Sequence, residues 1–236
     1  MKKKANIITK ISHYKILKVL VYNDRTNQME TYYKKPSDPM PYTQDNYLTV
    51  GEFQGSSKSD TLWTDRRLME SFNKLRNLYG SPIPVRYAFK RIGEGGHAGM
   101  SQHYAGMAMD MAQALTNEER NKIRKLAIEN KLFTYVEPAN LTPTWVHVDK
   151  RNPNPACPTG GYPVVRQGDK GVYVIVLQDA LNTLGYNAGT IDGIFGNNTK
   201  NAVMRYQKDK GLTADGIVGC NTWRSITQQV TKNRFY

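Results

Sequence analysis

The chain has 236 residues, of which 39% are hydrophobic and 22% are charged, a balance typical of a soluble globular protein. No run of about 18 or more apolar residues is present, which argues against a membrane-spanning helix and a membrane partner. The formal net charge of +13 favours polyanionic partners, such as nucleic acid or a bacterial wall with its teichoic acids and stem-peptide carboxylates. Because no nucleic-acid-binding motif accompanies the charge, we expect no nucleic-acid partner.

The N-terminus begins with Met1 and three lysines, as a signal peptide would. Lys10, His13, Lys15 and Lys18 then interrupt what should be a continuous apolar core. We therefore expect a folded strand here, and a protein made in the cytoplasm without a signal peptide.

The first predicted elements are a β-hairpin over residues 15–36 and a helix that ends near Tyr79. The hairpin combines two β-rich segments with a turn-like stretch, and residues 1–44 are interpreted as an N-terminal β-hairpin extension. Residues 36–61 are rich in Pro, Ser, Asp and Gly and are predicted to be largely loop. The helix begins at a Thr64 or Asp65 cap.

Residues 83–89 are predicted to form a strand, and a glycine-rich loop over residues 91–99 follows it. Thr116 and Glu119 have the spacing of a capping box, which predicts a helix through about Asn130.

Between these elements lies a stretch that carries His103 and, seven residues later, Asp110. Gly106 disfavours a helix, and the alternation around Asp110 favours a strand. On a strand, Asp110 would lie beside small alanines, with methionines on the core face. A turn at Ala105 and Gly106 would return His103 to the end of the strand near Asp110.

A second stretch carries His147, which alternation places on one strand face with Trp145 and Asp149. His147 and Asp149 would lie about 7 Å apart along the strand. Two imidazoles and one carboxylate suit a zinc site that keeps a fourth position open for water, as catalytic sites do. The nearby Asp149 is predicted to orient His147 or to accept a proton.

Residues 153–163 have a Pro/Gly linker composition and mark a domain boundary. Beyond it, residues 191–203 and 214–226 repeat an Asp-Gly turn followed by an Asn-Thr pair, which is predicted to cap a helix. With the amphipathic stretches around them, these turns predict a compact bundle of three short helices. Cys157 and Cys220 show no metal-site spacing and are interpreted as free thiols.

The C-terminal region, about residues 164–228, resembles the peptidoglycan-binding domain found at the ends of bacterial and phage wall hydrolases. The resemblance is carried by a nearly continuous series of core, turn and cap positions, among them Leu177, Gln178, Asp192, Gly193, Phe195, Gly196, Thr199, Gln207, Asp215, Gly216 and Thr222. It implies bacterial peptidoglycan as the partner of a domain over residues 164–230.

The pattern Ser-x-His-x-x-Gly-x-Ala-x-Asp followed by Trp-x-His-x-Asp resembles the zinc metallopeptidases of family M15. It is filled here by Ser101, His103, Gly106, Ala108, Asp110, Trp145, His147 and Asp149. The resemblance covers about residues 45–152. It implies an α+β peptidase domain over residues 1–152, with an antiparallel sheet like that of hedgehog and D,D-peptidases. It also implies Zn²⁺ as cofactor, with His103, Asp110 and His147 as its ligands.

Two positions depart from that family. Many members place an acid three residues before the last histidine as general base, and Thr144 occupies this position. We favour Glu137 as the base, with Asp149 as the alternative.

The second departure lies where the family often has an arginine that faces the substrate. Lys90, Arg91 or Arg86 must serve this role here, if any residue does. Ser101 and Gln102 are further candidates for binding the substrate.

The sequence therefore predicts a monomeric zinc peptidase, D,D-carboxypeptidase or endopeptidase, that cuts peptidoglycan stem peptides or cross-links. The C-terminal domain would target it to the cell wall after its release, as in bacteriolytic phage endolysins. The alternative is a non-catalytic wall-binding or virion structural protein with an architectural metal site.

Overall fold

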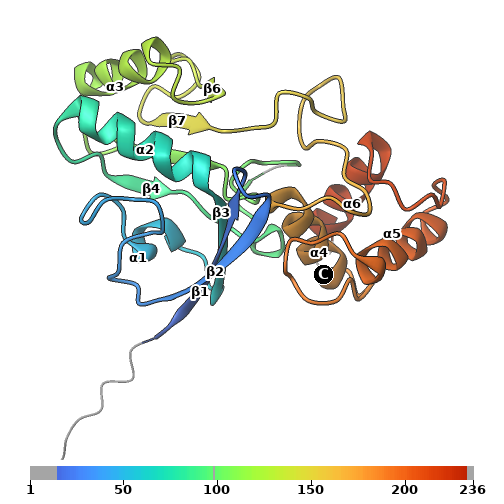
Figure 1. Ribbon diagram of the computed structural model, residues 1–236. Helices are drawn as coiled ribbons and strands as arrows, with labels where there is room; N and C mark the ends of the chain where they lie inside the picture. The colour runs from blue at the N-terminus through green and yellow to red at the C-terminus, as the bar shows by residue number, and fades with distance from the viewer. Residues whose placement is uncertain (1–14, 98, 233–236) are drawn as a thin grey trace, which may run out of the picture.

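The computed structural model describes residues 15–97 and 99–232. Two sheets and helices α1 to α3 form one half of the molecule, and helices α4 to α6 gather at its other side (Figure 1). This arrangement confirms the predicted α+β class and the helical C-terminal domain, whereas the likeness to hedgehog and D,D-peptidases stays a prediction. The strand expected near the N-terminus would begin among residues that lie outside the described part.

The first sheet has the strand order β2-β1-β3, formed by Gln28–Lys34, Leu17–Asn23 and Thr61–Asp65. The hairpin of β1 and β2 is antiparallel, as predicted, but β1 also pairs with β3 in parallel. β1 is thus the central strand, and its Leu17, Val19 and Val21 are fully buried. The hairpin predicted as an extension is therefore part of the core of the N-terminal half.

Helix α2, Arg66–Tyr79, begins at an Asp65 cap and ends at Gly80, as the sequence predicted. The segment 36–61 is not all loop, because it contains helix α1, Val50–Gln54. Thr49 and Glu52 form a capping box at its start, and buried Val50 and Phe53 fix it to the core.

The second sheet is antiparallel in the order β4-β5-β7-β6. Its strands are Val85–Tyr87, Ala108–Met111, Val146–Asp149 and Tyr135–Val136. A short 3-10 helix, Ile92–Glu94, follows β4, and helix α3, Asn117–Glu129, begins at the predicted box of Thr116 and Glu119.

The C-terminal domain consists of helices α4, α5 and α6, formed by Val172–Thr183, Asn197–Asp209 and Cys220–Lys232. The two sequence repeats make matching turns around a buried glutamine. The Gln178 amide donates to Asp192, Ile194 and Thr199. The Gln207 amide donates in the same way to Asp215, Ile217 and Thr222. The threonines therefore fasten the turns to the helix core and do not cap the helices.

The segment 153–163 is fixed to the C-terminal domain. Cys157 and Cys220 form a disulfide across 63 positions, so the interpretation of free thiols was wrong. Tyr162 is fully buried, and Trp223 of α6 donates its indole N–H to the Pro163 carbonyl at 2.8 Å. A segment with linker composition thus packs as an ordered part of the fold.

Candidate metal centre

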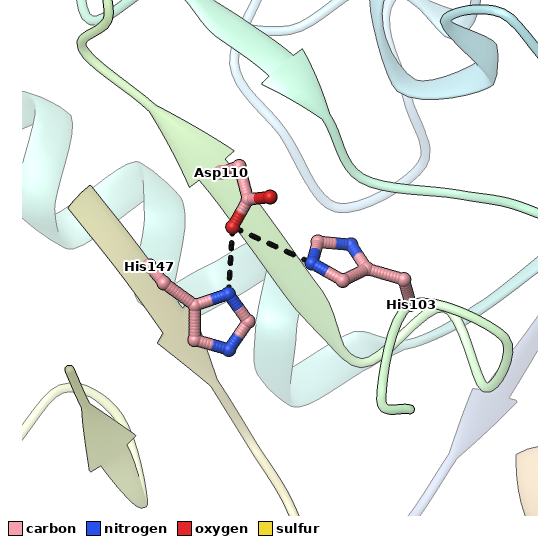
Figure 2. A group of neighbouring side chains, drawn as sticks. All are labelled: His103, Asp110 and His147. Atoms are coloured by element: carbon pink, nitrogen blue, oxygen red, sulfur yellow. Dashed lines mark hydrogen bonds and ion pairs between the residues drawn. The ribbon is translucent and has the colours of Figure 1, made fainter. Parts of the chain in front are cut away.

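The structure brings His103, Asp110 and His147 together at one edge of the second sheet. Asp110 lies on β5 and His147 on β7, and the two residues are direct partners in the antiparallel register. His103 approaches from the loop before β5 (Figure 2). This confirms the predicted placement of the three side chains, while their role in binding a metal stays a prediction.

Local packing explains the orientation of each strand. Met109 and Met111 of β5 and Val146 and Val148 of β7 are fully buried in the core of the N-terminal half. Because side chains alternate along a strand, Asp110 of β5 and His147 and Asp149 of β7 project to the opposite face. The methionine and valine spacing therefore places the polar side chains at the site.

One carboxylate oxygen of Asp110 contacts both imidazoles. His147 Nδ1 lies 2.6 Å from Asp110 Oδ1, and His103 Nε2 lies 3.4 Å from the same oxygen. The ligand atoms of the three residues all lie within 4.8 Å of one another. Two nitrogens and one oxygen at this spacing fit a zinc ion with an open coordination position.

Asp149 holds the other side of His147. Its Oδ2 lies 3.4 Å from His147 Nε2, and the Arg151 guanidinium binds both oxygens of this fully buried carboxylate. Arg151 also stacks over the Tyr135 ring, 3.9 Å from its centroid. A carboxylate behind a ligating histidine fixes its tautomer and ring orientation, and this arrangement favours orientation as the role of Asp149.

The electrostatics of the site centre on this histidine and its two carboxylates. Burial alone would lower the pKa of His147, but its hydrogen bonds to Asp110 and Asp149 outweigh burial and raise the pKa to about 9. Burial opposes ionisation of Asp110, yet hydrogen bonds to both histidines hold its pKa far below the usual range. Without a metal, the site is therefore an imidazolium paired with carboxylates.

Glu137 directly follows β6, and its backbone lies beside that of His147 on β7. Strands β6 and β7 pair Tyr135 with Asp149, and the Glu137 N–H donates to the His147 carbonyl at 2.9 Å. Residues opposite each other in an antiparallel pair project to the same face, with Cβ atoms about 5 Å apart. The Glu137 backbone therefore lies on the side of β7 away from β5, the strand that carries Asp110.

A cleft of about 280 Å³ adjoins His147. His147, Asp149 and Arg151 line it together with the expected substrate-binding residues Ser101 and Gln102. The Gln102 side chain is already engaged, since its amide donates to the Gly161 carbonyl at 3.4 Å and accepts from Tyr173 at 3.0 Å.

His97, in the glycine-rich loop over residues 91–99, is a further residue of this cleft. Its ring stacks on His103 with 4.3 Å between centroids. Burial, with the neighbouring His103, lowers the pKa of His97 to about 4, so this imidazole is neutral at pH 7. Its position in a glycine-rich loop was the only signal in the sequence.

Two of the three basic candidates for substrate binding, Lys90 and Arg91, have different surroundings. The Lys90 N–H donates to the His103 carbonyl at 3.4 Å, so Lys90 borders the His103 loop. Arg91 instead donates to the fully buried Asp179 of α4. This pairing ties Arg91 to the C-terminal domain, and the predicted substrate role does not fit it.

Comparison with known proteins identifies the C-terminal part of the chain. Residues 170–226 match the family described as "Putative peptidoglycan binding domain". An N-acetylmuramoyl-L-alanine amidase of Mycobacterium tuberculosis is 51% identical over 53 residues, which cover 22% of this chain and 13% of that protein. A spore cortex-lytic enzyme of Oceanobacillus iheyensis is 37% identical over 31% of this chain and 26% of its own length. The chain thus spans only a small part of these two relatives.

An uncharacterised protein of Kitasatospora aureofaciens is 41% identical over 33% of this chain and 69% of its own length. Among solved structures, a peptidoglycan-binding protein of Clostridioides difficile is 45% identical, covering 28% of this chain and 42% of that chain with a TM-score of 0.28. Through residues 170–226, this chain therefore belongs to the proteins that carry a peptidoglycan-binding domain.

Proposed function

We propose that this protein is a zinc-dependent peptidase that hydrolyses peptide bonds in peptidoglycan stem peptides or cross-links. The observation that carries the proposal is the cluster of His103, Asp110 and His147 in a chain that also has a peptidoglycan-binding domain. The cluster has the donor set of a catalytic zinc site, and the domain supports a wall polymer as the substrate.

The residues of the site divide the chemistry among them. A zinc ion held by His103, Asp110 and His147 would supply a Lewis acid that polarises the scissile carbonyl and makes water acidic. Glu137 accepts the proton of the attacking water and returns it to the leaving amine. Lys90 supplies the positive charge that stabilises the carbonyl oxygen as it becomes negative.

The C-terminal domain keeps the enzyme on its polymeric substrate and raises the local concentration of scissile bonds. The disulfide of Cys157 and Cys220 supports action outside the reducing cytoplasm, because such bonds persist in oxidising surroundings. Within residues 15–97 and 99–232, no helix has the length and apolarity needed to cross a membrane. From the wall-binding domain and the disulfide, we propose that the protein acts at the bacterial wall after release, as a monomeric enzyme of the endolysin type.

Purified peptidoglycan tests this function directly. The zinc-loaded protein is expected to release new amino termini, and mass spectrometry of the products will assign them to bonds within the stem peptide or cross-link. Chelation and the variants His147→Ala and Asp110→Asn should abolish release while binding to sedimented walls persists.

Two outcomes would contradict the proposal. Cleavage only between the glycan and the first amino acid would indicate an amidase. Walls that are bound but never cut, with zinc restored, would indicate a non-catalytic wall-binding protein with an architectural metal site.

A further inference from the structure

The loop that carries His103 lies between the two halves of the molecule. On one side it rests on β3, where Trp63 donates to the Tyr104 carbonyl at 2.8 Å and Thr64 donates to the Gly106 carbonyl at 2.7 Å. On the other side, Tyr104, Ala105 and Met107 are buried in the same apolar cluster as the helices of the C-terminal domain. The ligand loop is therefore part of the interdomain contact.

Tyr162 makes the first polar contact from the C-terminal side. This fully buried residue donates its hydroxyl to the Ser101 carbonyl at 2.6 Å. The Ser101 hydroxyl in turn accepts from the His103 N–H at 3.3 Å, and the Ser101 carbonyl also accepts from the Tyr104 N–H at 3.2 Å. Through its hydrogen bond to Ser101, the Tyr162 hydroxyl thus stabilises the turn that carries His103.

Tyr173 of α4 makes the second contact. Its hydroxyl donates to the Gln102 side-chain oxygen at 3.0 Å and accepts from the Asn152 N–H at 3.0 Å. Gln102 directly precedes His103, and Asn152 lies three residues beyond Asp149. The Tyr173 hydroxyl therefore hydrogen-bonds both the loop that carries His103, at Gln102, and the segment that follows β7, at Asn152.

The segment that carries Tyr162 has little freedom to move. The disulfide of Cys157 with Cys220 anchors it to α6, and the Tyr162 ring packs against Trp223 with 5.0 Å between centroids. The Ala156 N–H donates to the Tyr162 carbonyl at 2.8 Å. Because Tyr162 is held in place, it constrains the Ser101 carbonyl. A different position of the His103 loop would leave the buried Tyr162 hydroxyl without an acceptor.

We propose that Tyr162 and Tyr173 are positioning residues for His103, so that the wall-binding half sets the geometry of the metal centre. This inference rests on the proposed function, because it takes His103 to be a metal ligand. It assigns the C-terminal half a second role beside binding the wall.

The test uses the full-length double variant Tyr162→Phe/Tyr173→Phe, which removes two hydroxyls and keeps both rings. We expect its zinc affinity, measured by competition with a chromophoric chelator, to fall on the order of tenfold, as for partners that orient ligands. With saturating zinc and a soluble muropeptide, kcat should fall by a similar factor while KM stays within about twofold. Binding to sedimented walls should be unchanged.

Tyr206→Phe is the matched control. Tyr206 is also fully buried in the C-terminal domain, but its hydroxyl bonds Ser225 of α6 at 2.7 Å. This variant loses a buried hydroxyl from the same domain and should keep the zinc affinity and kcat of the original protein. Equal losses in the control and the double variant would show general destabilisation and overturn the proposal.

The proposal is also overturned if the double variant binds zinc and turns over as the original protein does. A protein that binds zinc but cleaves no peptidoglycan refutes the proposed function alone, because the zinc affinities of the variants still decide the positioning role. A protein that binds no zinc refutes both.

Discussion

At the scale of single residues, Glu137 and Asp149 differ in what their carboxylates already bind. Asp149 is fully buried, and Arg151 and His147 occupy its oxygens. Burial disfavours ionisation of Asp149, but its bonds to Arg151 and His147 hold its pKa below the usual range, so it is a poor proton acceptor at neutral pH. Glu137 is partly exposed beside His147 and suits proton transfer better.

Exchange of each acid for its amide separates the two roles. With saturating zinc, Glu137→Gln should lower kcat by about 10² to 10⁴-fold and leave zinc affinity unchanged, because only a proton acceptor is lost. Asp149→Asn should instead weaken zinc binding by about 10 to 100-fold. Assays of kcat and chelator competition measure both effects. Full activity of Glu137→Gln would exclude it as the general base.

The metal-free site should make stability depend on pH through His147. Folding raises the pKa of His147 from 6.5 to about 9, so the folded state holds this proton more tightly than the unfolded state does. The resulting stability is fully present below about pH 6.5 and is lost as pH rises through about 9. At about 1.4 kcal/mol per unit, the loss is roughly 3 kcal/mol.

Urea unfolding of chelator-stripped protein at pH 6, 7.5 and 9 measures this dependence. His147→Gln removes the titrating group and should show a flatter profile. Zinc affinity should change in the opposite sense, rising with pH, because the metal displaces the His147 proton. An equal pH dependence of the free energy of unfolding in the original protein and in His147→Gln would show that His147 is not the titrating group.

At the scale of elements, the turn before β5 depends on a close approach of two backbones. Gly106 has φ of +62°, and a Cβ added there would lie 1.9 Å from the Trp63 carbonyl oxygen. Gly80 at the end of α2 has a similar φ of +78°, but an added Cβ would meet nothing within 4 Å. Substitution of Gly80 therefore tests backbone strain alone, whereas substitution of Gly106 adds a steric overlap with Trp63.

Gly106→Ala should displace the His103 loop, abolish high-affinity zinc binding and cost more stability than backbone strain alone. Gly80→Ala should cost only the strain, about 1–2 kcal/mol, and leave zinc affinity intact. Urea unfolding and chelator competition on both variants provide the comparison. Normal zinc binding by Gly106→Ala would show that the loop does not need this approach to β3.

Local signals allowed much of the fold to be predicted from the sequence. Asp65 and the box of Thr116 and Glu119 marked two helix starts, and alternation placed Asp110 and His147 on strands. The box at Thr49 and Glu52 carried an equally local signal for α1, which the loop-like composition around it concealed.

Long-range contacts could not be predicted in the same way. The parallel pairing of β1 with β3 and the disulfide of Cys157 with Cys220 depend on tertiary packing that no local pattern encodes. The same holds for the contacts of Tyr162 and Tyr173 with the His103 loop. The clustering of His103, Asp110 and His147 was therefore predictable, whereas the groups that hold these side chains in place were not.

At the scale of the whole molecule, the two halves share their interior. Ile175 of α4 belongs to the apolar core of the N-terminal half, while Tyr104 and Met107 belong to that of the C-terminal half. The buried Asp179 accepts from Arg91 across the same contact. Removal of either half would expose apolar surface, and removal of the N-terminal half would also leave the buried Asp179 carboxylate without Arg91. We therefore expect the two halves to unfold together.

Calorimetry of the zinc-loaded protein should show one transition with equal calorimetric and van't Hoff enthalpies. Zinc at 100 times its Kd adds about 2.7 kcal/mol to the folded state. For a chain of this size, that shifts the whole transition by roughly 5–10 °C. Amide exchange in α5, which contributes no ligand, should slow on zinc binding in the original protein but not in Asp110→Asn. Two transitions, of which zinc moves only one, would show instead that the wall-binding half folds independently of the metal centre.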